Sequence, residues 1–373
     1  MHVGKIELTN FRNYDKFKID DLGNINIIIG DNGIGKTSIL ESIYVGCTAR
    51  TFKSNDEDVL IKEGKDFTKI KILLLSDREK KLDYTLTKDG KKTKINGVLK
   101  KRISDYIFQY KVVIFSPDEL KIIKESPTVR RNYLNVSLSQ INKSYVNLLK
   151  EYNVLIKNKN EYLKRMMINS NMDELYLDIL DEKISIVGSE ICNIRSGYVL
   201  RVNKYIKKIF SKFKKNDSLS IKYSSQFLDK NKEDIVKLLK KNRNYEMNLG
   251  LTKTGVHRDD ILFLHNNLNA RDYSSVGTQK LILLCFKMAE LEVLINDYYE
   301  EPILLLDDLF SELDIVNQNN VISNLNTKIQ VFITTTDVNN VKPSLVKKAK
   351  IIDLNGGMEK WVKVIIMKVI FKS

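Results

Sequence analysis

The sequence predicts an α/β protein whose mixed sheet is interrupted by a long, mainly helical insertion. Apolar runs typical of strands occupy both ends of the chain, and helical periodicity fills the middle. Proline nearly vanishes from that middle part, since the next proline after Pro127 is Pro302. Near the start, IIIGDNGIGKTSILESI at residues 27–43 places a glycine-rich turn between an apolar run and a helix pattern, which indicates a strand–loop–helix unit.

The first part of the chain reads as strands and turns around one helix. The strand patterns are KIELTNFRNY, INIIIG, KIKILLLS, KLDYTLTKDGKKTKINGV and KVVIFS. Asn96-Gly97 predicts a two-residue hairpin turn, because both residue types tolerate positive φ. We therefore expect a mixed sheet with antiparallel parts.

The middle part changes to the spacing of amphipathic helices. Apolar side chains recur at intervals of three and four among Lys, Asn and Glu, at Tyr145, Leu148, Leu149, Tyr152, Leu155, Ile156 and Tyr162. The segment is too short and irregular for a long coiled-coil arm. We expect an inserted helical lobe at residues 118–245 and a discontinuous lobe made of residues 1–117 and 246–373.

Strand patterns return in the last third of the chain. DDILFLH, EPILLLDD and KIQVFITTTD are compact apolar runs, typical of buried parallel strands, with a helix expected around TQKLILLCFKMAELEVLI. The ending WVKVIIMKVIFKS fits either a last strand or an amphipathic tail, and a strand is the favoured interpretation.

Composition predicts a globular, cytoplasmic protein that does not span a membrane. Of the 373 residues, 43% are apolar and 29% are charged. No apolar run approaches the length of about 18 residues that a membrane helix needs, and the start lacks the apolar core of a signal peptide. Cys47, Cys192 and Cys285 stand far apart, so the spacing supports neither a disulfide framework nor a zinc site.

The chain is strongly basic. It has 62 Lys and Arg against 47 Asp and Glu, a formal net charge of +15. Such a surplus suits phosphate backbones or anionic membrane surfaces. Lys, Asn and Ile are abundant all along the chain, however, as a composition bias would produce, so charge alone does not identify a partner.

Residues 30–37 read G-x-x-x-x-G-K-T, which predicts a phosphate-binding loop for a nucleotide. Backbone N–H groups of such a loop surround the phosphates, Lys36 bridges the β- and γ-phosphate oxygens, and the Thr37 hydroxyl ligates Mg²⁺. The residues expected to contact the nucleotide are Gly30, Asp31, Asn32, Gly33, Ile34, Gly35, Lys36, Thr37 and Ser38.

A second acidic element is expected to complete the metal site. In PILLLDDLFSELD the apolar run ends at Asp307, where a magnesium ligand belongs, and Asp308 follows where a general base could orient the attacking water. A single Asp there would suggest only a solvated turn. Two in register with a phosphate loop favour the metal and catalytic interpretation.

A third motif, S-x-G-x-Q, opens the helix that lies between these two in the sequence. Ser275, Gly277 and Gln279 stand at the N-terminal end of that helix. The simplest interpretation is a serine N-cap with a glycine-containing turn. Its place behind the phosphate loop and just before the acidic strand favours a role at the nucleotide.

This motif series resembles that of ABC-type ATPases, and within them the chain resembles the RecF family, which is related to the SMC group. The matching stretches follow in order as LTNFRNY, GDNGIGKTSILESIY, IFSPDELKIIKESPTVRRNYLN, GVHRDD, LLLDDLFSELD and QVFITTTD. The resemblance implies an ABC-type ATPase lobe with an inserted helical lobe. It spans the chain from about residue 3 to 355.

The resemblance also implies a composite site in an ATP-dependent homodimer. In ABC-type ATPases two nucleotides lie between two subunits, so Ser275 and Gly277 of one chain, with Gln279, would cap ATP held by Lys36 and Thr37 of its partner. Asp308, Lys36 and Ser275 acting in trans are then the expected catalytic residues. Asp308 stands where a longer Glu is commoner, and Thr336-Asp337 replaces a switch His, so hydrolysis should be slow.

RecF-like proteins bind duplex and gapped DNA, work with RecO and RecR, and help to load RecA in repair, replication and the SOS response. The candidate DNA contacts are basic clusters, namely Lys91, Lys92 and Lys94 on one hairpin strand, Lys100, Lys101 and Arg102 after it, Arg130 and Arg131, and the lysine-rich helix RVNKYIKKIFSKFKK. The alternative is a regulatory or SMC-like ATPase that acts through protein partners. A transporter-type or motor ATPase is disfavoured by Asp308, the missing switch His and the long insertion.

Overall fold

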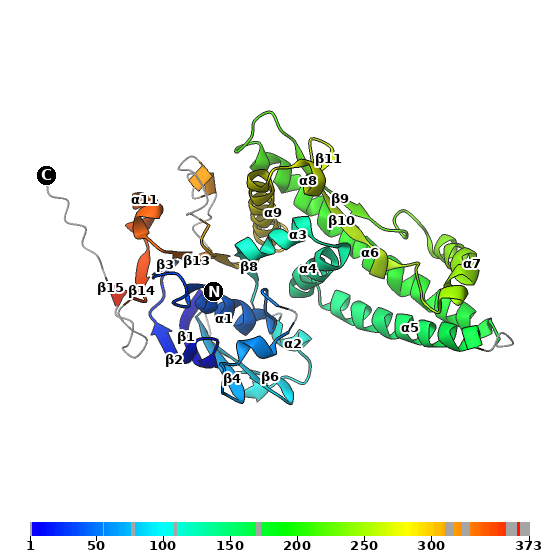
Figure 1. Ribbon diagram of the computed structural model, residues 1–373, viewed down its shortest axis with the longest axis horizontal. Helices are drawn as coiled ribbons and strands as arrows, with labels where there is room; N and C mark the ends of the chain where they lie inside the picture. Colours follow the sequence, from blue (N-terminus) through cyan, green and yellow to red (C-terminus); the bar gives the residue numbers. More distant parts are fainter. Residues whose placement is uncertain are drawn as a thin grey trace. The chain divides into compact units, whose positions relative to one another are not determined.

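The computed structural model describes residues 2–54, 56–75, 79–107, 110–168, 173–309, 317–318, 320–321, 329–355 and 364–365 (Figure 1). The chain divides into two compact units. The first contains Met1–Leu120, Lys212–Lys215 and Leu283–Ser373, and the second contains Lys121–Ser211 and Asn216–Ile282.

A mostly parallel sheet forms the centre of the first unit. Its strand order is β15 (Val364–Ile365), β14 (Lys350–Asp353), β3 (Ile25–Ile29), β13 (Gln330–Thr335), β12 (Ile303–Leu306) and β8 (Val112–Phe115). Five strands run parallel, and β15 pairs antiparallel with β14. The prediction of buried parallel strands at EPILLLDD and KIQVFITTTD is confirmed. The carboxyl ends of these strands meet at one edge, where ligands of α/β sheets bind.

A second, antiparallel sheet belongs to the same unit. Its order is β2 (Tyr14–Asp20), β1 (His2–Phe11), β4 (Phe67–Leu75), β5 (Lys80–Thr87), β6 (Gly90–Ile95) and β7 (Val98–Leu99). Buried apolar and exposed polar residues alternate along the strands, so only one face belongs to the core. The predicted hairpin is confirmed, because Ile95 pairs with Val98 and both turn residues have positive φ.

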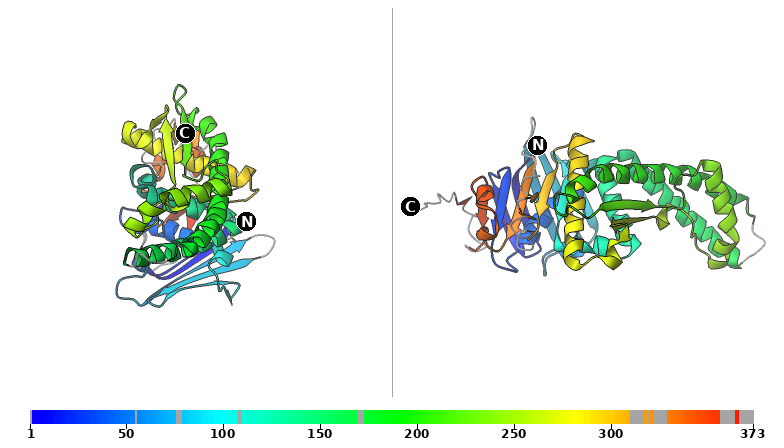
Figure 2. Two further views of the ribbon diagram at one scale, coloured as in Figure 1. Left: turned by 90° about the vertical axis from the view of Figure 1, so that its right-hand side faces the viewer. Right: turned by 90° about the horizontal axis from the view of Figure 1, so that it is seen from above.

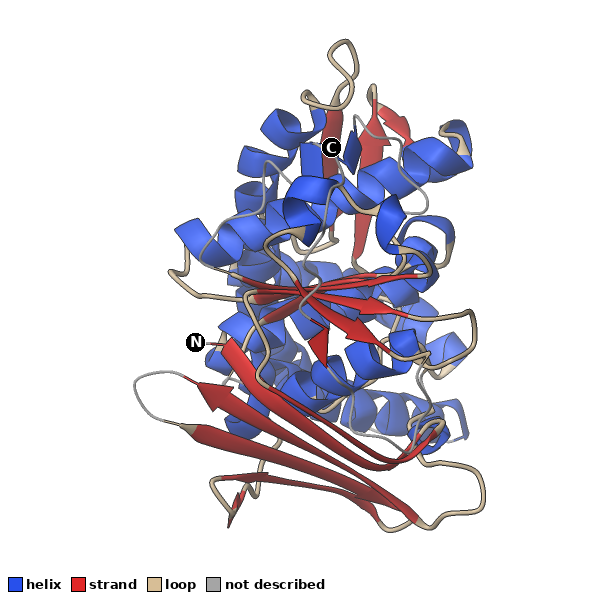
Figure 3. Cartoon of the chain, turned by 90° about the vertical axis from the view of Figure 1, so that its left-hand side faces the viewer, coloured by secondary structure: helices blue, strands red, loops and turns tan. Residues whose placement is uncertain are grey.

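The two sheets form separate layers with helix between them (Figure 3). Helix α1 (Lys36–Thr48) is buried along nearly its whole length, and one apolar cluster joins it to both sheets. Gly46 permits this close packing, because a Cβ there would come within 2.3 Å of Ile72 Cδ1. The smaller elements of this unit are η1 (Asp58–Leu60), α2 (Ser104–Ile107), η2 (Pro117–Leu120), η4 (Val338–Asn340) and α11 (Pro343–Val346).

Helices dominate the second unit. They are α3 (Lys121–Lys124), α4 (Pro127–Ile141), α5 (Lys143–Ile168), α6 (Leu175–Phe210), α7 (Lys232–Leu249) and α8 (Ala270–Tyr273), while α9 (Val276–Asn296) begins here and ends in the first unit. Helices α5 and α6 lie side by side (Figure 2). The predicted stripe is confirmed at Tyr145, Tyr152 and Leu155, which are buried on α5.

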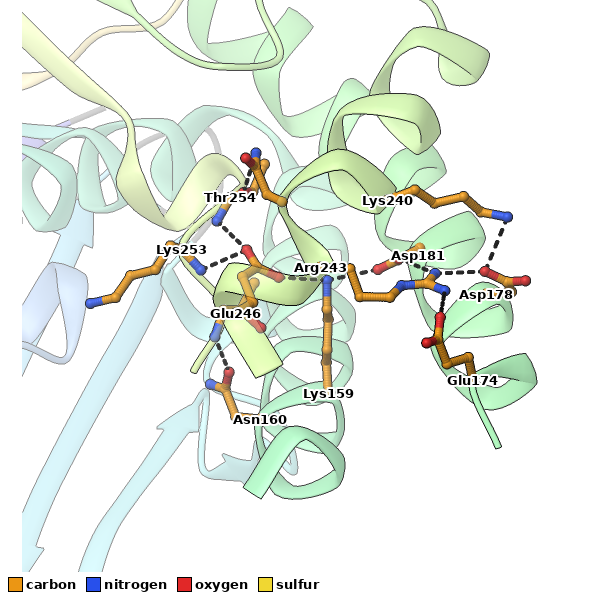
Figure 4. A network of polar contacts seen from close by, with 12 residues as sticks. Lys159, Asn160, Glu174, Asp178, Asp181, Lys240, Arg243, Glu246, Lys253 and Thr254 are labelled. Atoms are coloured by element: carbon orange, nitrogen blue, oxygen red, sulfur yellow. Dashed lines mark hydrogen bonds and ion pairs between the residues drawn. The ribbon is translucent and has the colours of Figure 1, made fainter. Parts of the chain in front are cut away.

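A buried network of charges joins α5, α6 and α7 (Figure 4). Lys159 Nζ lies 2.8 Å from Asp181 Oδ1 and 2.9 Å from Glu246 Oε2, and all three side chains are fully buried. Arg243 donates to Asp181 at 2.8 Å, and also to Glu174 and Asp178. Helical periodicity did not predict this network, because a lysine occupies a position on the apolar stripe of α5.

The prediction that DDILFLH is a buried parallel strand is wrong. Strand β10 (Asp260–His265) lies in an antiparallel sheet of order β11 (Leu268–Asn269), β10, β9 (Leu219–Ser224) in the second unit. Only alternate residues of β10 are buried, because the strand has one buried face. The short helix η3 (Val256–Arg258) precedes it.

The compact units differ from the expected lobes mainly after residue 245, and also at residues 118–120 and 212–215, which group with the first unit. Residues 246–282, expected in the first lobe, group with the second unit, since β10 pairs with β9. As a statement about domains, the division at 117/118 and 245/246 remains a proposal. Most of the expected C-terminal strand lies outside the described residues, apart from the two residues of β15.

Among the described residues, every helix is either too short or too polar to span a membrane.

Candidate nucleotide site

The phosphate loop follows β3 and leads directly into α1. Gly33 and Gly35 have φ values of 81° and 109°, which favour glycine at both positions. Behind the loop the Tyr14 hydroxyl donates to the Gly35 carbonyl at 3.2 Å. A Cβ on Gly35 would meet that hydroxyl at 2.6 Å, so the tyrosine and the glycine fix the loop's path together.

Lys36 lies over its own loop. Its Nζ donates to the carbonyls of Gly30 at 2.6 Å and Asp31 at 2.9 Å. Burial lowers the pKa of the lysine, while Asp308, Asp307 and Asp31 oppose that shift. The ammonium group is thus placed where it can exchange two loop carbonyls for phosphate oxygens.

Asp307 is held by hydroxyl groups from three directions. The Thr334 hydroxyl donates to Oδ1 at 2.8 Å, the Thr37 hydroxyl donates to the same oxygen at 2.9 Å, and Ser116 donates to Oδ2 at 3.4 Å. Burial raises the pKa of the Asp307 carboxyl, and the hydrogen bonds from Thr334 and Thr37 oppose this. The predicted partners Thr37 and Asp307 are therefore in direct contact.

Asp308 has an unusual backbone conformation. Its φ is 48°, in the left-handed region that non-glycine residues seldom adopt. Its N–H donates to the Thr334 hydroxyl at 2.9 Å. The Thr334 hydroxyl consequently bonds to both acidic residues, to the carboxylate of Asp307 and to the backbone N–H of Asp308.

Sequence reasoning missed Ser116 and Thr334 as site residues. Each comes from the C-terminal end of a buried strand beside β12, Ser116 directly after β8 and Thr334 near the end of β13. Both side chains are fully buried. Hydroxyl residues at the carboxyl ends of apolar strand runs were the signal that could have identified them.

The residues present fit Mg²⁺ and a nucleotide phosphate. A hydroxyl and a carboxylate oxygen in contact supply the hard oxygen donors that magnesium prefers. A glycine-rich loop at the start of a helix, with one lysine folded against it, supplies an anion site. The fit therefore rests on the kinds of donor atom that these residues supply.

Helix α1 is also anchored at its side. Arg12 makes two hydrogen bonds of 2.8 Å to the fully buried Glu41 carboxylate, and Thr51 donates to the same carboxylate at 2.5 Å. Charge-assisted paired hydrogen bonds of this kind are strong and directional. They connect the LTNFRNY segment to the helix that begins at Lys36.

The S-x-G-x-Q segment lies in the second unit. Ser275 Oγ accepts from the Thr278 N–H at 3.3 Å, as an N-cap does, and the side chain remains exposed. A Cβ on Gly277 would meet nothing within 4 Å. Gln279 is buried, and its amide donates to the carbonyls of Ala270, Arg271 and Ser274 at 3.0 to 3.1 Å.

Gln279 therefore stabilises the turn that presents Ser275. This arrangement opposes the expectation that its side chain contacts nucleotide. The S-E-L-D stretch after Asp308, at 311–314, lies outside the described residues. At the expected switch position the Asp337 side chain accepts from the Asn339 N–H, which caps η4.

Five of the expected DNA contacts, those at residues 100–102 and 130–131, divide into two groups. Lys101 and Arg102 are exposed and Lys100 is half-buried. Arg130 is only 4% exposed and makes hydrogen bonds of 2.6 and 2.9 Å to the two Asp260 carboxylate oxygens. Arg131 donates to the Asp259 carbonyl and to Thr128. A phosphate contact by Arg130 would require its buried ion pair to break, so the structure opposes that role.

The fold and the site together define an ABC-type phosphate-loop ATPase. The family model described as RecF/RecN/SMC N terminal domain matches residues 2–356. The DNA replication and repair protein RecF of Staphylococcus carnosus is 35% identical over 367 residues, which is 96% of this chain and 99% of that protein. RecF of Clostridium perfringens is 36% identical over 362 residues, with 96% and 99% covered. The chain belongs to the RecF family.

Solved structures agree with this assignment. A structure of the recombination mediator protein RecF with ATP, from the RecFOR pathway, is 31% identical and superposes with a TM-score of 0.86, covering 94% of this chain and 95% of that one. The Smc head domain of Pyrococcus furiosus has a TM-score of 0.52 at 17% identity, covering 94% and 93%. This second likeness concerns the fold alone.

Proposed function

We propose that this chain is a DNA-binding ATPase of recombinational repair and replication. It closes as an ATP-dependent homodimer on duplex and gapped DNA, and slow hydrolysis lets the dimer open. The observation that carries the proposal is the meeting of Lys36, Thr37, Asp307 and Asp308 around one phosphate loop, with Thr334 bonded to both acids.

Each residue has a role that follows from its position. Lys36 binds phosphate oxygens in place of the carbonyls of Gly30 and Asp31. Thr37 and Asp307 hold Mg²⁺, which when bound neutralises phosphate charge. Asp308 orients the attacking water as the general base.

Hydrolysis is expected to be slow because Asp308 is short. An aspartate carboxylate reaches one methylene less far than a glutamate carboxylate, and a misplacement of about 1 Å can cost roughly a hundredfold in rate. The left-handed backbone at Asp308 and the hydrogen bond from its N–H to Thr334 hold the point from which the side chain extends. The backbone therefore has little freedom to move the short carboxylate closer to the attacking water. The rate of hydrolysis then sets how long the dimer stays closed.

Dimerisation would complete the site. Ser275 is exposed at the start of α9, and open space surrounds Gly277. A helix N-terminus is favourable for an anion, so this segment of one chain would cap the γ-phosphate held by its partner. Closure would thus depend on ATP and would be lost with ADP.

The DNA role comes from the relatives and from charge. The relatives are named DNA replication and repair proteins, and a structural neighbour is named a recombination mediator of the RecFOR pathway. The formal charge of +15 suits a phosphate backbone. By the same likeness RecO and RecR are the proposed protein partners in loading RecA, and the cytoplasm is the proposed location.

The test is retention on gapped duplex DNA at rising salt, with ATP, with ADP and without nucleotide. We expect retention to be strongest with ATP, and Lys36→Met to abolish the difference between nucleotides. Equal retention under all three conditions would overturn the clamp. ATP-dependent dimerisation without DNA retention would instead favour the alternative, a regulatory ATPase acting through protein partners.

A further inference from the structure

The face of the antiparallel sheet opposite α1 carries a regular array of lysines, here called the lysine face. Burial alternates along each strand, so the residues that pair across the sheet at exposed or half-buried positions share this face. Its lysines are Lys16 and Lys18 on β2, Lys5 on β1, Lys69 and Lys71 on β4, Lys81 on β5, and Lys92 and Lys94 on β6. Three acids share the face, namely Glu7, Asp20 and Asp83.

Strand register places these lysines in rows. Thr9 pairs with Lys16 on one side and with Lys69 on the other, and Thr85 pairs with Lys69 and Lys92. One row therefore reads Lys, Thr, Lys, Thr, Lys across five strands. Since neighbouring strands lie about 4.8 Å apart, the lysine backbones repeat about every 9.6 Å over about 19 Å.

A second row lies two residues along the strands. It places Lys18, Lys71 and Lys94 on the same alternate strands, with Glu7 and Asp83 between them. Here the charges are partly compensated, because Lys71 lies 3.8 Å from Glu7 and Lys18 lies 3.3 Å from Asp20.

The first row has no such compensation. In the part of the chain that the structure describes, Lys16, Lys69 and Lys92 form no ion pair, and the residues between them are threonines. The eight lysines outnumber the three acids of the lysine face. An array of one charge, spread over the breadth of a sheet, is complementary to a polyanion with regularly repeating charges.

Duplex DNA is the polyanion that fits this surface. Its phosphates repeat regularly on both strands, so cations in rows can neutralise several at once, without reading bases. Apolar anchors for a protein partner are outnumbered on the lysine face. The large apolar residues at its paired positions in the described strands are Phe67, Leu73, Leu75 and Leu99, against eight lysines.

We propose that the lysine face binds the phosphate backbone of duplex DNA, with Lys16, Lys69 and Lys92 as its main contacts. This inference rests on the proposed DNA-binding function and adds a surface to the cations at Lys100, Lys101 and Arg102. The contact is insensitive to sequence and sensitive to salt.

The test compares two charge-matched triple variants of the full chain with the unchanged protein. The first is Lys16→Gln, Lys69→Gln and Lys92→Gln. The control is Lys150→Gln, Lys237→Gln and Lys241→Gln, which removes three exposed lysines from α5 and α7 of the second unit. The measurement is affinity for a fluorescent duplex with ATP between about 50 and 200 mM salt.

The two variants should differ in salt dependence. Three lost phosphate contacts lower the slope of log affinity against log salt by about 2.7, so the loss of affinity over a fourfold salt change shrinks about 40-fold. The control should keep the slope of the unchanged protein. Thermal unfolding of both variants should match, because all six substituted side chains are at least partly exposed.

The other outcomes refute either the lysine face alone or the proposed function as well. An unchanged slope in the first variant, or an equal reduction in the control, refutes the lysine face while the proposed function stands. Absence of duplex binding by the unchanged protein refutes both. A parallel arm uses vesicles rich in anionic lipid: vesicle binding lost in the first variant, with duplex binding intact, would assign the face to a membrane surface instead.

Discussion

Thr334 connects the two acidic residues of the candidate site. Its hydroxyl donates to Asp307 and accepts from the Asp308 N–H, so one side chain sets the position of the proposed magnesium ligand and of the proposed base. Thr334 is fully buried, and water therefore does not replace either bond easily. It is a positioning residue.

We expect Thr334→Val to impair hydrolysis more than nucleotide binding. Loss of a bond that orients a metal ligand typically costs about 10- to 100-fold in metal affinity or activity. The Mg²⁺ concentration for half-maximal hydrolysis should rise, while ATP binding changes little. Thr335→Val is the control, since that hydroxyl donates to the Asp337 carbonyl and contacts neither acid. An unaltered Mg²⁺ requirement would contradict this role.

His257 is a half-buried imidazole in the second unit. The Thr252 carbonyl can only accept, so Nε2 carries the proton at 3.2 Å and Nδ1 accepts from the Tyr152 hydroxyl at 3.0 Å. Burial lowers the pKa of His257 to about 4, with Arg258 and Arg131 contributing, while the Thr252 carbonyl and Glu246 oppose the shift.

Stability should therefore fall in mild acid. In the unfolded chain His257 has a pKa of about 6.5, so it takes up a proton there before it does in the fold. The stability is fully present above pH 6.5 and is lost as the pH falls toward 4, by about 3 kcal/mol at most. Urea unfolding at pH 7 and pH 4.5 should show a smaller loss for His257→Gln than for the unchanged protein. Equal losses would contradict it.

Sequence patterns identified individual site residues where a motif fixes their chemistry. Lys36, Thr37 and Asp307 were predicted, and the structure brings them together. For Gln279 the nucleotide role stays a prediction that the structure opposes, because its amide donates to its own turn, which a sequence does not reveal. For Arg130 the DNA role is likewise opposed by a partner that the sequence does not indicate, since Asp260 lies 130 residues away.

Among the elements, α5, α6 and α7 depend on their buried charge network. We expect Lys159→Ala to lower the free energy of unfolding by about 3 to 5 kcal/mol, because it leaves Asp181 and Glu246 as uncompensated buried charges. Lys157→Ala should cost less than about 0.5 kcal/mol, since Lys157 is exposed and its pair with Glu161 is long. Urea unfolding followed by circular dichroism measures both. Similar values for the two variants would contradict the network's importance.

The sequence predicted correctly whether a strand is parallel only where both faces of the strand are buried. β12 and β13 read as continuous apolar runs and are parallel, central strands. The run in β10 has similar letters but pairs antiparallel with β9, a partner that helical periodicity had concealed. Local pattern gives the element, and pairing with distant residues gives its sheet.

At the scale of the whole molecule, the motif order predicted the fold family because phosphate loop, S-x-G-x-Q and acidic strand come in a fixed sequence. One chain cannot reveal the composite site, since Ser275 is expected to act on the nucleotide of a second copy. The exposed Ser275 and the open space at Gly277 are compatible with that role. Such a role requires that ATP join two chains.

Light scattering of the full chain with ATP and Mg²⁺, with ADP and without nucleotide measures whether ATP joins two chains. We expect the mass to double from 43.2 kDa only with ATP. Asp308→Asn should keep the dimer after ATP is diluted, because hydrolysis no longer opens it, and Ser275→Arg should remain monomeric although it binds ATP. A monomer at saturating ATP, or a dimer whatever the nucleotide, would contradict the ATP-gated clamp.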